Sequence, residues 1–361
     1  MLDYSGTKRK MTFKSLKYFL LMAAVAVSAV SCDDDDDSTV YPSLSGLTFD
    51  CPLFVAPRQV VKMTPEGVTH PDGKGIGYYW KVSPSMPDAD TTRLENGRHP
   101  YTDRETDGSL VFTFSDTLAS YSVTCYAFAS GYSGDSYTLT VAVVDGGLDR
   151  SITNTGILAS DNHVTSGGTD YYYETIGGLD WFRNNLVDMD KGTAFAGEEV
   201  TSGVFGRYYS YEEALTACPE GWRLPTEEDW LALCASIGAP SVPEYSTVSG
   251  VASKLFADAR FNGEPMLEYW PAVGKITNES GISIIPSGFS NLGEKNQSGI
   301  YPSATFEGLY DYAVLWTADR VDGNDGMAYY RYLISDQPDF YVGKGDVNSF
   351  GASVRCVRDS E

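Results

Sequence analysis

Histidine is scarce in this sequence, which holds only His70, His99 and His163 among its 361 residues. None of them lies in the core of the motif-rich C-terminal region, so Ser/His/Asp and Cys/His nucleophilic sites and histidine-rich zinc sites are excluded there. The sequence also lacks a phosphate-binding loop and a dinucleotide-binding glycine fingerprint. Catalysis that depends on a histidine base, on zinc or on a bound nucleotide is therefore not expected.

Basic residues are also few, since 26 lysines and arginines stand against 49 aspartates and glutamates, for a net charge of −23. Loss of residues 1–31, which hold five basic residues and one acidic residue, would bring the net charge to −27. Nucleic acids and anionic membrane surfaces bind to basic patches. We therefore expect no nucleic acid as a partner, and no membrane contact through the folded part of the chain.

The sequence offers no apolar segment long enough to cross a bilayer, which takes about 20 residues. The short run from Tyr18 to Val30 ends in small residues and follows a basic cluster. A basic head, a short apolar middle and a small-residue exit predict a signal peptide at residues 1–31, with Met11 as an alternative start. The basic cluster comprises Lys8, Arg9, Lys10, Lys14 and Lys17.

The segment Ala29-Val30-Ser31-Cys32 resembles a lipobox, which predicts acylation of Cys32, although Ala29 stands where leucine is usual. An ordinary cleavage site with a chance cysteine is the alternative. The acidic run that follows predicts a solvated tether over residues 32–43. The acidic run also resembles the export signal of Bacteroidetes-type lipoproteins. We therefore expect a lipid-anchored outer-membrane protein that faces the cell exterior. The alternative is that the acidic run is a spacer and nothing more. The run comprises Asp33, Asp34, Asp35, Asp36 and Asp37.

Residues 44–146 read as short alternating strands broken by proline, glycine and aspartate, which is typical of an antiparallel β-sandwich. The order Cys51, Trp80, Cys125 resembles that of immunoglobulin domains, and the region is similar to a PKD or bacterial immunoglobulin-like module. We expect it to space or present its neighbour, with direct ligand binding as the alternative. Gly146 and Gly147 begin a polar joint. The predicted strands lie at 46–50, 59–63, 77–82, 109–114, 121–127 and 137–143.

Residues 147–361 combine short strands with two helices that carry capping signals. Ser210 with Glu213, and Thr226 with Asp229, have the spacing of capping boxes, and they predict one helix from Tyr211 to about Ala217 and a second from Glu227. On the second helix the residues 230, 234 and 237 share one apolar face. This pattern predicts an α+β domain after the all-β sandwich.

Five motifs of this region occur in an order that resembles the Fibrobacter succinogenes major paralogous domain, abbreviated FISUMP. The resemblance covers nearly all of residues 170–359 and implies a C-type-lectin-like architecture on secreted proteins and surface lipoproteins, without a defined activity. A serine-rich turn normally follows the late tryptophan, and here residues 316–319 replace it. The motifs are Leu179-Asp-Trp-Phe-Arg-Asn-Asn-Leu186, Tyr209-Ser-Tyr-Glu-Glu-Ala214, Cys218-Pro-Glu-Gly-Trp-Arg-Leu-Pro225, the glycine-rich stretch from Asn278 to Gly288, and Ser353-Val-Arg-Cys-Val357.

Five cysteines remain after Cys32, and an extracytoplasmic protein can form disulfides. The lectin-like resemblance implies a bridge between Cys218 and Cys356, with two buried thiols as the alternative. Cys51 and Cys125 are a second candidate pair. A cysteine that is left over on an apolar helix face, Cys234, is expected to be a buried thiol.

Three kinds of site remain open in the C-terminal region. A formylglycine-generating activity is excluded because it needs two late cysteines, whereas a carboxylate-pair glycosidase is not excluded by composition. Calcium is the only cofactor left open, because Gln337-Pro338-Asp339 resembles a lectin calcium motif; no Trp-Asn-Asp follows it, and a simple turn is the preferred reading. Exposed aromatic residues bind sugars and proteins. The candidate ligand contacts are Tyr310, Trp316, Asp339 and Tyr341.

These observations predict a cell-surface lipoprotein that acts as a non-catalytic binding or adhesion module for a glycan or a protein of the cell surface or envelope. A structural or fimbria-associated envelope subunit is the alternative, and a carboxylate-dependent glycoside hydrolase is a third hypothesis. The sequence identifies neither the ligand nor the oligomeric state.

Overall fold

The computed structural model of the chain describes residues 41–83, 108–144, 162–257 and 276–360, together with the backbone of residues 260–261 and 264–265. The predicted signal peptide, the lipidation site Cys32, the acidic run 33–37 and most of the predicted joint lie outside the described residues. We refer to residues 41–144 as the N-terminal unit and to residues 162–360 as the C-terminal unit.

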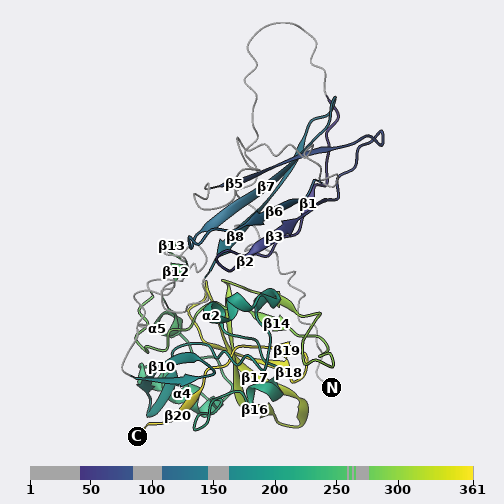
Figure 1. The fold of residues 1–361 in the computed structure, drawn as a ribbon. Coiled ribbons are helices and arrows are strands. Elements are labelled where there is room, and N and C mark those ends of the chain that lie inside the picture. Colours follow the sequence, from purple (N-terminus) through teal and green to yellow (C-terminus); the bar gives the residue numbers. More distant parts are fainter. Residues whose placement is uncertain are drawn as a thin grey trace.

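The described residues of the N-terminal unit form strands and their connections, and these strands lie together at one end of the molecule (Figure 1). One sheet has the strand order β2-β8-β7-β5, and two further antiparallel pairs are β1–β4 and β3–β6. All six strands predicted from the sequence have a counterpart here. The strands are β1 (Thr48–Phe49), β2 (Phe54–Val55), β3 (Val60–Met63), β4 (Pro65–Glu66), β5 (Gly77–Ser83), β6 (Leu110–Thr113), β7 (Ser120–Phe128) and β8 (Asp135–Val143).

Alternation of side chains along β7 builds the core of this unit. Tyr121, Val123, Cys125 and Ala127 are buried, and the residues between them are half-buried. Successive residues of a strand point to opposite faces, so these four share one face. Trp80 pairs with Cys125 across β5 and β7 and is 1 % exposed. The unit therefore has a hydrophobic core of its own, drawn from residues between Leu44 and Val143.

The two core cysteines of this unit are separate thiols, which corrects their proposal as a disulfide pair. Cys51 lies in the connection between β1 and β2, whereas Cys125 lies in the middle of β7, flanked across the sheet by Trp80 and Tyr137. Burial, with smaller effects of Asp50 and Glu198 at Cys51, raises the pKa of each thiol to about 12. Both cysteines therefore act as small apolar core residues.

The C-terminal unit mixes strands with short helices. Its larger sheets have the orders β20-β11-β10-β9, β15-β14-β19 and β16-β17-β18. The strands are β9 (His163–Ser166), β10 (Thr169–Ile176), β11 (Leu179–Phe182), β12 (Arg260–Phe261), β13 (Glu264–Pro265), β14 (Phe289–Asn291), β15 (Thr305–Glu307), β16 (Tyr312–Val321), β17 (Asn324–Ile334), β18 (Tyr341–Asp346), β19 (Phe350–Gly351) and β20 (Val357–Asp359); the helices are η3 (Phe195–Gly197), η4 (Glu199–Thr201), α2 (Ser202–Phe205), α3 (Tyr211–Ala214), α4 (Glu227–Ser236) and α5 (Ala252–Leu255).

Both predicted capping boxes are present. The Ser210 hydroxyl accepts a hydrogen bond from the Glu213 amide while the Glu213 carboxylate accepts one from the Ser210 amide, and Thr226 and Asp229 are paired in the same way. These reciprocal bonds satisfy amides that a helix start leaves without partners. The first helix is shorter than predicted, since α3 ends at Ala214 and turns continue toward Cys218.

The bridge between Cys218 and Cys356 is confirmed. It joins the turn that follows α3 to the residue before β20, with a Cα–Cα distance of 5.8 Å and a sequence separation of 138. In the chain-entropy description, a loop of this length stabilises the folded state by roughly 3–5 kcal/mol. Cys234 is a buried thiol on α4, as predicted.

One hydrophobic cluster draws on both units, and we call it the junction cluster. Phe54 of β2 packs edge-on against Phe195 of η3 at 5.8 Å and against Phe205 of α2 at 5.5 Å between ring centroids. Ala142 and Val144, at the end of β8, belong to the same cluster. The two units therefore meet through buried apolar side chains. Within the described ranges, no helix has the length and apolar character needed to cross a membrane.

Candidate functional site: an aromatic sheet face

The sheet β16-β17-β18 presents rows of aromatic residues on one of its faces. Val314, Tyr332 and Tyr341 are paired across the three strands. The next row consists of Trp316, Tyr330 and Gly343. Directly paired residues point to the same side of a sheet, so both rows share one face. Tyr312 joins this face from the start of β16, two residues before Val314.

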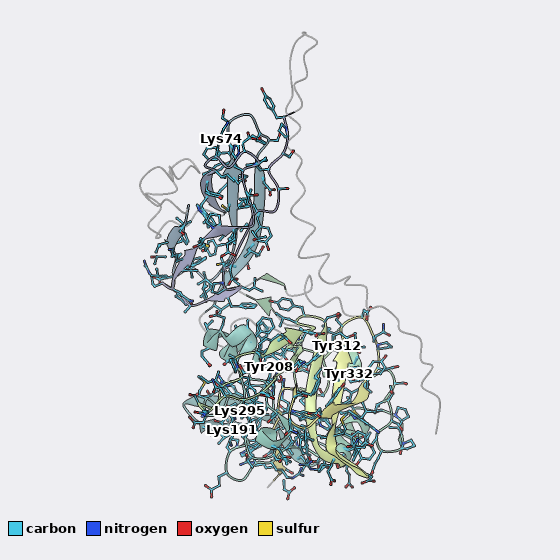
Figure 2. The ribbon with its side chains drawn as sticks, turned by 90° about the vertical axis from the view of Figure 1, so that its right-hand side faces the viewer. Lys74, Lys191, Tyr208, Lys295, Tyr312 and Tyr332 are labelled. Atoms are coloured by element: carbon cyan, nitrogen blue, oxygen red, sulfur yellow. A yellow bond between two sulfur atoms is a disulfide. The ribbon has the colours of Figure 1, made fainter. Side chains whose placement is uncertain are left out.

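Six half-buried rings form a continuous surface on this side, which we call the aromatic face. Tyr332 lies between Tyr312, at 6.5 Å, and Tyr341, at 5.2 Å between ring centroids. Tyr330 stacks on Phe350 at 4.8 Å with 18° between the ring planes. Figure 2 shows Tyr312 and Tyr332 side by side in the C-terminal unit. The aromatic face comprises Phe289, Tyr312, Tyr330, Tyr332, Tyr341 and Phe350.

Glycines on β18 allow these rings to lie flat against the strand. A β-carbon at Gly343 would collide with the ring of Tyr330. One at Gly345 would approach Phe350 to 2.6 Å and Trp316 to 2.9 Å. Glycine in the interior of a strand is unfavourable and often marks a close approach of another group. Here the missing side chains make room for the rings.

Burial affects the tyrosine hydroxyls of the aromatic face. It raises the pKa of Tyr312, Tyr330, Tyr332 and Tyr341 above the usual value for tyrosine. These four hydroxyls are therefore neutral at physiological pH and can both donate and accept hydrogen bonds. A surface that combines flat apolar rings with neutral hydroxyls suits ligands that have apolar faces and polar edges.

Three carboxylates lie at the Tyr312–Tyr341 end, and we call them the acidic rim. Asp311 and Asp336 add to the rise in the pKa of Tyr312, after burial, while Asp339 and Asp336 do so for Tyr341. Asp336 is exposed, and the other two are half-buried. The acidic rim comprises Asp311, Asp336 and Asp339.

The opposite face of the sheet is fixed by a buried ion pair. Arg331, which alternates with Tyr330 and Tyr332 on β17, donates two hydrogen bonds to Glu227, and one of them spans 2.9 Å from Nε to Oε2. The side chains are 0 % and 1 % exposed. Arg331 also donates to the carbonyls of Ser246 and Phe340. These bonds hold β17 against the start of α4 from the side opposite the aromatic face.

The comparison with protein families matches the Fibrobacter succinogenes major domain to residues 175–358, just over half of the chain. The chain belongs to this family. The match spans β11 to β20 and so includes the whole aromatic face of this FISUMP domain. Membership agrees with a cell-surface protein in general. A search of curated proteins finds no match to the chain.

The structure places the four ligand contacts predicted for the FISUMP domain in different surroundings. Tyr341 lies on the aromatic face and Asp339 on its rim. Tyr310 packs against Phe205 at 6.2 Å, beside the junction cluster. Trp316 is 0 % exposed, and its Nε1 donates to the Tyr209 carbonyl at 2.8 Å. A direct ligand contact by Trp316 is therefore wrong, because Tyr211 and Phe350 pack against its ring and enclose it.

The segment Gln337-Pro338-Asp339 follows a turn closed by a hydrogen bond from the Gln337 backbone amide to the Ile334 carbonyl, in line with the preferred reading of the sequence. The Asp339 carboxylate accepts a hydrogen bond from the Gly250 amide at 2.9 Å, and the Gln337 amide donates to Asp336 at 3.0 Å. Among the described residues, no group of three or more His, Cys, Asp or Glu side chains is arranged to hold a metal ion. Each of these two carboxylates thus has its Oδ1 occupied by the protein, Asp336 within the turn and Asp339 by the distant Gly250.

Phe289 and Phe350 were missed in the sequence because each lies on a two- or three-residue strand, outside any periodic segment. Two signals were available for the rest of the aromatic face. Tyr330 and Tyr332 have the spacing of one strand face, and so do Tyr341, Gly343 and Gly345.

Proposed function

We propose that the chain is a cell-surface lipoprotein whose FISUMP domain is a non-catalytic binding module, with a glycan as its ligand. In this proposal Cys32 carries the lipid anchor, and residues 33–37 direct the protein to the outer face of the outer membrane. The N-terminal unit is an immunoglobulin- or PKD-like spacer, and the C-terminal unit is a lectin-like head. Family membership supports a surface location.

The aromatic face is the single observation that carries the glycan proposal. Sugar rings have apolar C–H faces that stack on aromatic rings, and hydroxyl edges that hydrogen-bond to neutral tyrosines and carboxylates. Tyr312, Tyr332 and Tyr341 supply three neighbouring half-buried rings next to acidic acceptors. Contiguous apolar patches on a protein surface often mark interaction sites.

The non-catalytic part of the proposal rests on how the buried glutamates are used. Glu227 is paired with Arg331, and Glu213 accepts hydrogen bonds from Lys295 and Tyr301. Hydrogen bonds lower the pKa of Glu213 in spite of its burial. A glycosidase acid needs a raised pKa so that it stays protonated near neutral pH, which Glu213 lacks. Burial raises the pKa of Glu198, at the start of η4, but this residue does not belong to the aromatic face.

The first test is a glycan-array screen of the chain from residue 33 onward, run with and without calcium. We expect saturable binding to at least one glycan, and binding that does not depend on calcium. Tyr341→Ala and Tyr332→Ala should each weaken that binding by at least about tenfold, as loss of a central aromatic contact does.

The control for this test is Tyr126→Ala in the N-terminal unit. Tyr126 is also a half-buried stacked tyrosine, 4.3 Å from Tyr79. We expect the Tyr126→Ala variant to lose the stacking contact with Tyr79 and to keep its glycan binding. If the folded wild-type chain binds no glycan and instead self-associates on gel filtration, the structural envelope-subunit hypothesis replaces this one. Hydrolysis of chromogenic glycosides would favour the third hypothesis.

A further inference from the structure

The acidic rim has no cationic partner within the part of the chain that the structure describes. Neither Asp311, Asp336 nor Asp339 forms an ion pair with a described lysine or arginine. The nearest basic residues of the sheet serve its other face, where Lys344 lies over Tyr329 at 5.1 Å and Arg331 binds Glu227. Three carboxylates thus stand at one end of the aromatic face without neutralising charges.

In each rim carboxylate, one of the two oxygens accepts a hydrogen bond from the protein. The Oδ1 atoms accept from the Ser335 hydroxyl, the Gln337 amide and the Gly250 amide, respectively, at 2.8, 3.0 and 2.9 Å. No described protein group donates to their Oδ2 atoms. A carboxylate oxygen of this kind accepts hydrogen bonds from sugar hydroxyls or amines. The rim can therefore bind donors, and it repels any ligand group that carries negative charge.

We propose that the aromatic face selects glycan chains that carry no carboxylate or sulfate groups. This inference rests on the proposed function and adds the charge class of the ligand. Stacking on the tyrosines gives affinity but little discrimination, since most pyranose rings have an apolar face. The acidic rim supplies the discrimination, because an anionic sugar beside Tyr312 or Tyr341 meets like charges at short range. The chain's overall excess of acidic residues acts in the same direction.

The test compares glycans that share a backbone and differ in charge. Affinity electrophoresis is run with hydroxyethylcellulose against carboxymethylcellulose, with guar galactomannan against carboxymethyl guar, and with a soluble β-1,3-glucan against its carboxymethyl derivative. We expect the neutral member of at least one pair to bind at least about tenfold more tightly at low salt. The ratio should shrink in about 1 M salt, where the screening length falls to about 3 Å.

The deciding variant is Asp311→Asn with Asp336→Asn, which keeps the Oδ1 acceptors and removes two charges. It should raise binding of the carboxymethyl glycan toward that of its neutral partner. The control is Asp50→Asn with Glu66→Gln, which removes two exposed charges from the N-terminal unit and should leave the ratio unchanged.

Two results overturn the inference while the proposed function stands. One is tighter or equal binding of the carboxymethyl glycan by the wild-type chain. The other is an unchanged neutral-to-anionic binding ratio in the rim variant, while Tyr341→Ala still weakens glycan binding at least about tenfold. Failure of every glycan, neutral and anionic, to bind the folded chain would instead remove the proposed function and this inference with it.

Discussion

At the residue scale, Glu213 joins three segments of the C-terminal unit. Its Oε2 accepts from the Ser210 amide and from the Tyr301 hydroxyl, at 3.0 and 2.8 Å. Its Oε1 accepts from Lys295 at 2.6 Å and from the Gly192 amide at 3.2 Å. Burial opposes ionisation of this carboxyl, but these donors outweigh burial, so the pKa lies below the usual value for glutamate.

Glu213→Gln should therefore lower the free energy of unfolding by about 2 kcal/mol at pH 7, the typical contribution of hydrogen bonds to a charged group. A carboxyl with a depressed folded pKa stabilises fully above its unfolded pKa of about 4.3, and this contribution is lost as the pH falls through the folded pKa. The difference in the free energy of unfolding between Glu213→Gln and the wild type should thus shrink below about pH 4. Urea denaturation at pH 7 and pH 3 measures it.

The neighbouring Glu212 provides the control. It pairs with Arg320 at the surface and is 54 % exposed. Surface ion pairs contribute less than about 1 kcal/mol, so Glu212→Gln should change stability little at either pH. A Glu213→Gln deficit that stayed constant from pH 7 to pH 3 would contradict the assignment of the lowered pKa.

Arg355 is a buried cation that is held without a carboxylate. Its side chain is 0 % exposed and donates to Asn185 Oδ1 at 2.7 Å, and to the carbonyls of Phe182, Ile282 and Ser283. Burial, with a smaller effect of Arg183, lowers its pKa to about 9. Arg355 is still charged at neutral pH, so these acceptors replace its hydration shell. This explains an arginine inside the C-terminal Ser-Val-Arg-Cys-Val motif.

At the element scale, local sequence patterns predict where helices and strands begin, but they do not predict which strands pair. Capping boxes depend on residues three apart, so the starts of α3 and α4 could be predicted from Ser210 and Thr226. The strands of the N-terminal unit followed from alternation. Pairing register is different, because it depends on which strands meet. The composition of the aromatic face depends on the irregular pairing of β16 and β17 after Trp316, and on rings supplied by β14 and β19. Neither feature can be predicted from local sequence patterns.

Trp316 illustrates the limit. Its spacing from Tyr312 and Val314 places it on the same side of β16, yet Tyr312 is half-buried and Trp316 is fully buried. Phe350 and Tyr211 come from distant parts of the chain and cover the tryptophan. The sequence of β16 alone contains no signal for such a cover, so exposure of individual aromatic residues could not be predicted.

The strand β18 gives a test of the glycine arrangement. Gly343→Ala should lower the free energy of unfolding by about 1–3 kcal/mol, because the new methyl group forces the Tyr330 ring to move. It should also weaken glycan binding, since that ring belongs to the aromatic face. Urea denaturation and the glycan assay measure both effects.

Gly326 on β17 serves as the matched control. A β-carbon there would meet only Asn324 Oδ1, at 3.5 Å, which is an ordinary contact. Gly326→Ala should therefore leave binding unchanged, and its stability should be unchanged or slightly higher. Equal losses from the two substitutions would show that the effect comes from strand backbone and not from the ring.

At the scale of the whole molecule, the junction cluster determines how independently the two units unfold. Phe54→Ala should remove the contacts with Phe195 and Phe205. It should lower the free energy that couples unfolding of the two units by about 3–5 kcal/mol, the usual loss for a large-to-small change in a core. Differential scanning calorimetry should then show two separated transitions where the wild type shows one.

The control for the junction is Val60→Ala, which trims a side chain of the same unit that is 60 % exposed. It should leave the calorimetric profile unchanged, because exposed side chains contribute little. Two transitions in the wild type, with the same spacing as in Phe54→Ala, would mean that the junction cluster does not couple the units.

The long span of the disulfide also sets an order in time. Cys218 has no native partner until a further 138 residues have been made, which takes roughly 7–28 s at 5–20 residues per second. During that interval a wrong partner would be a risk. Cys51 and Cys125 belong to a core whose residues end at Val143, and their pKa values are each raised to about 12, so they hold almost no reactive thiolate once that core has formed. Early burial of Cys51 and Cys125 thus protects the correct pairing of Cys218 with Cys356.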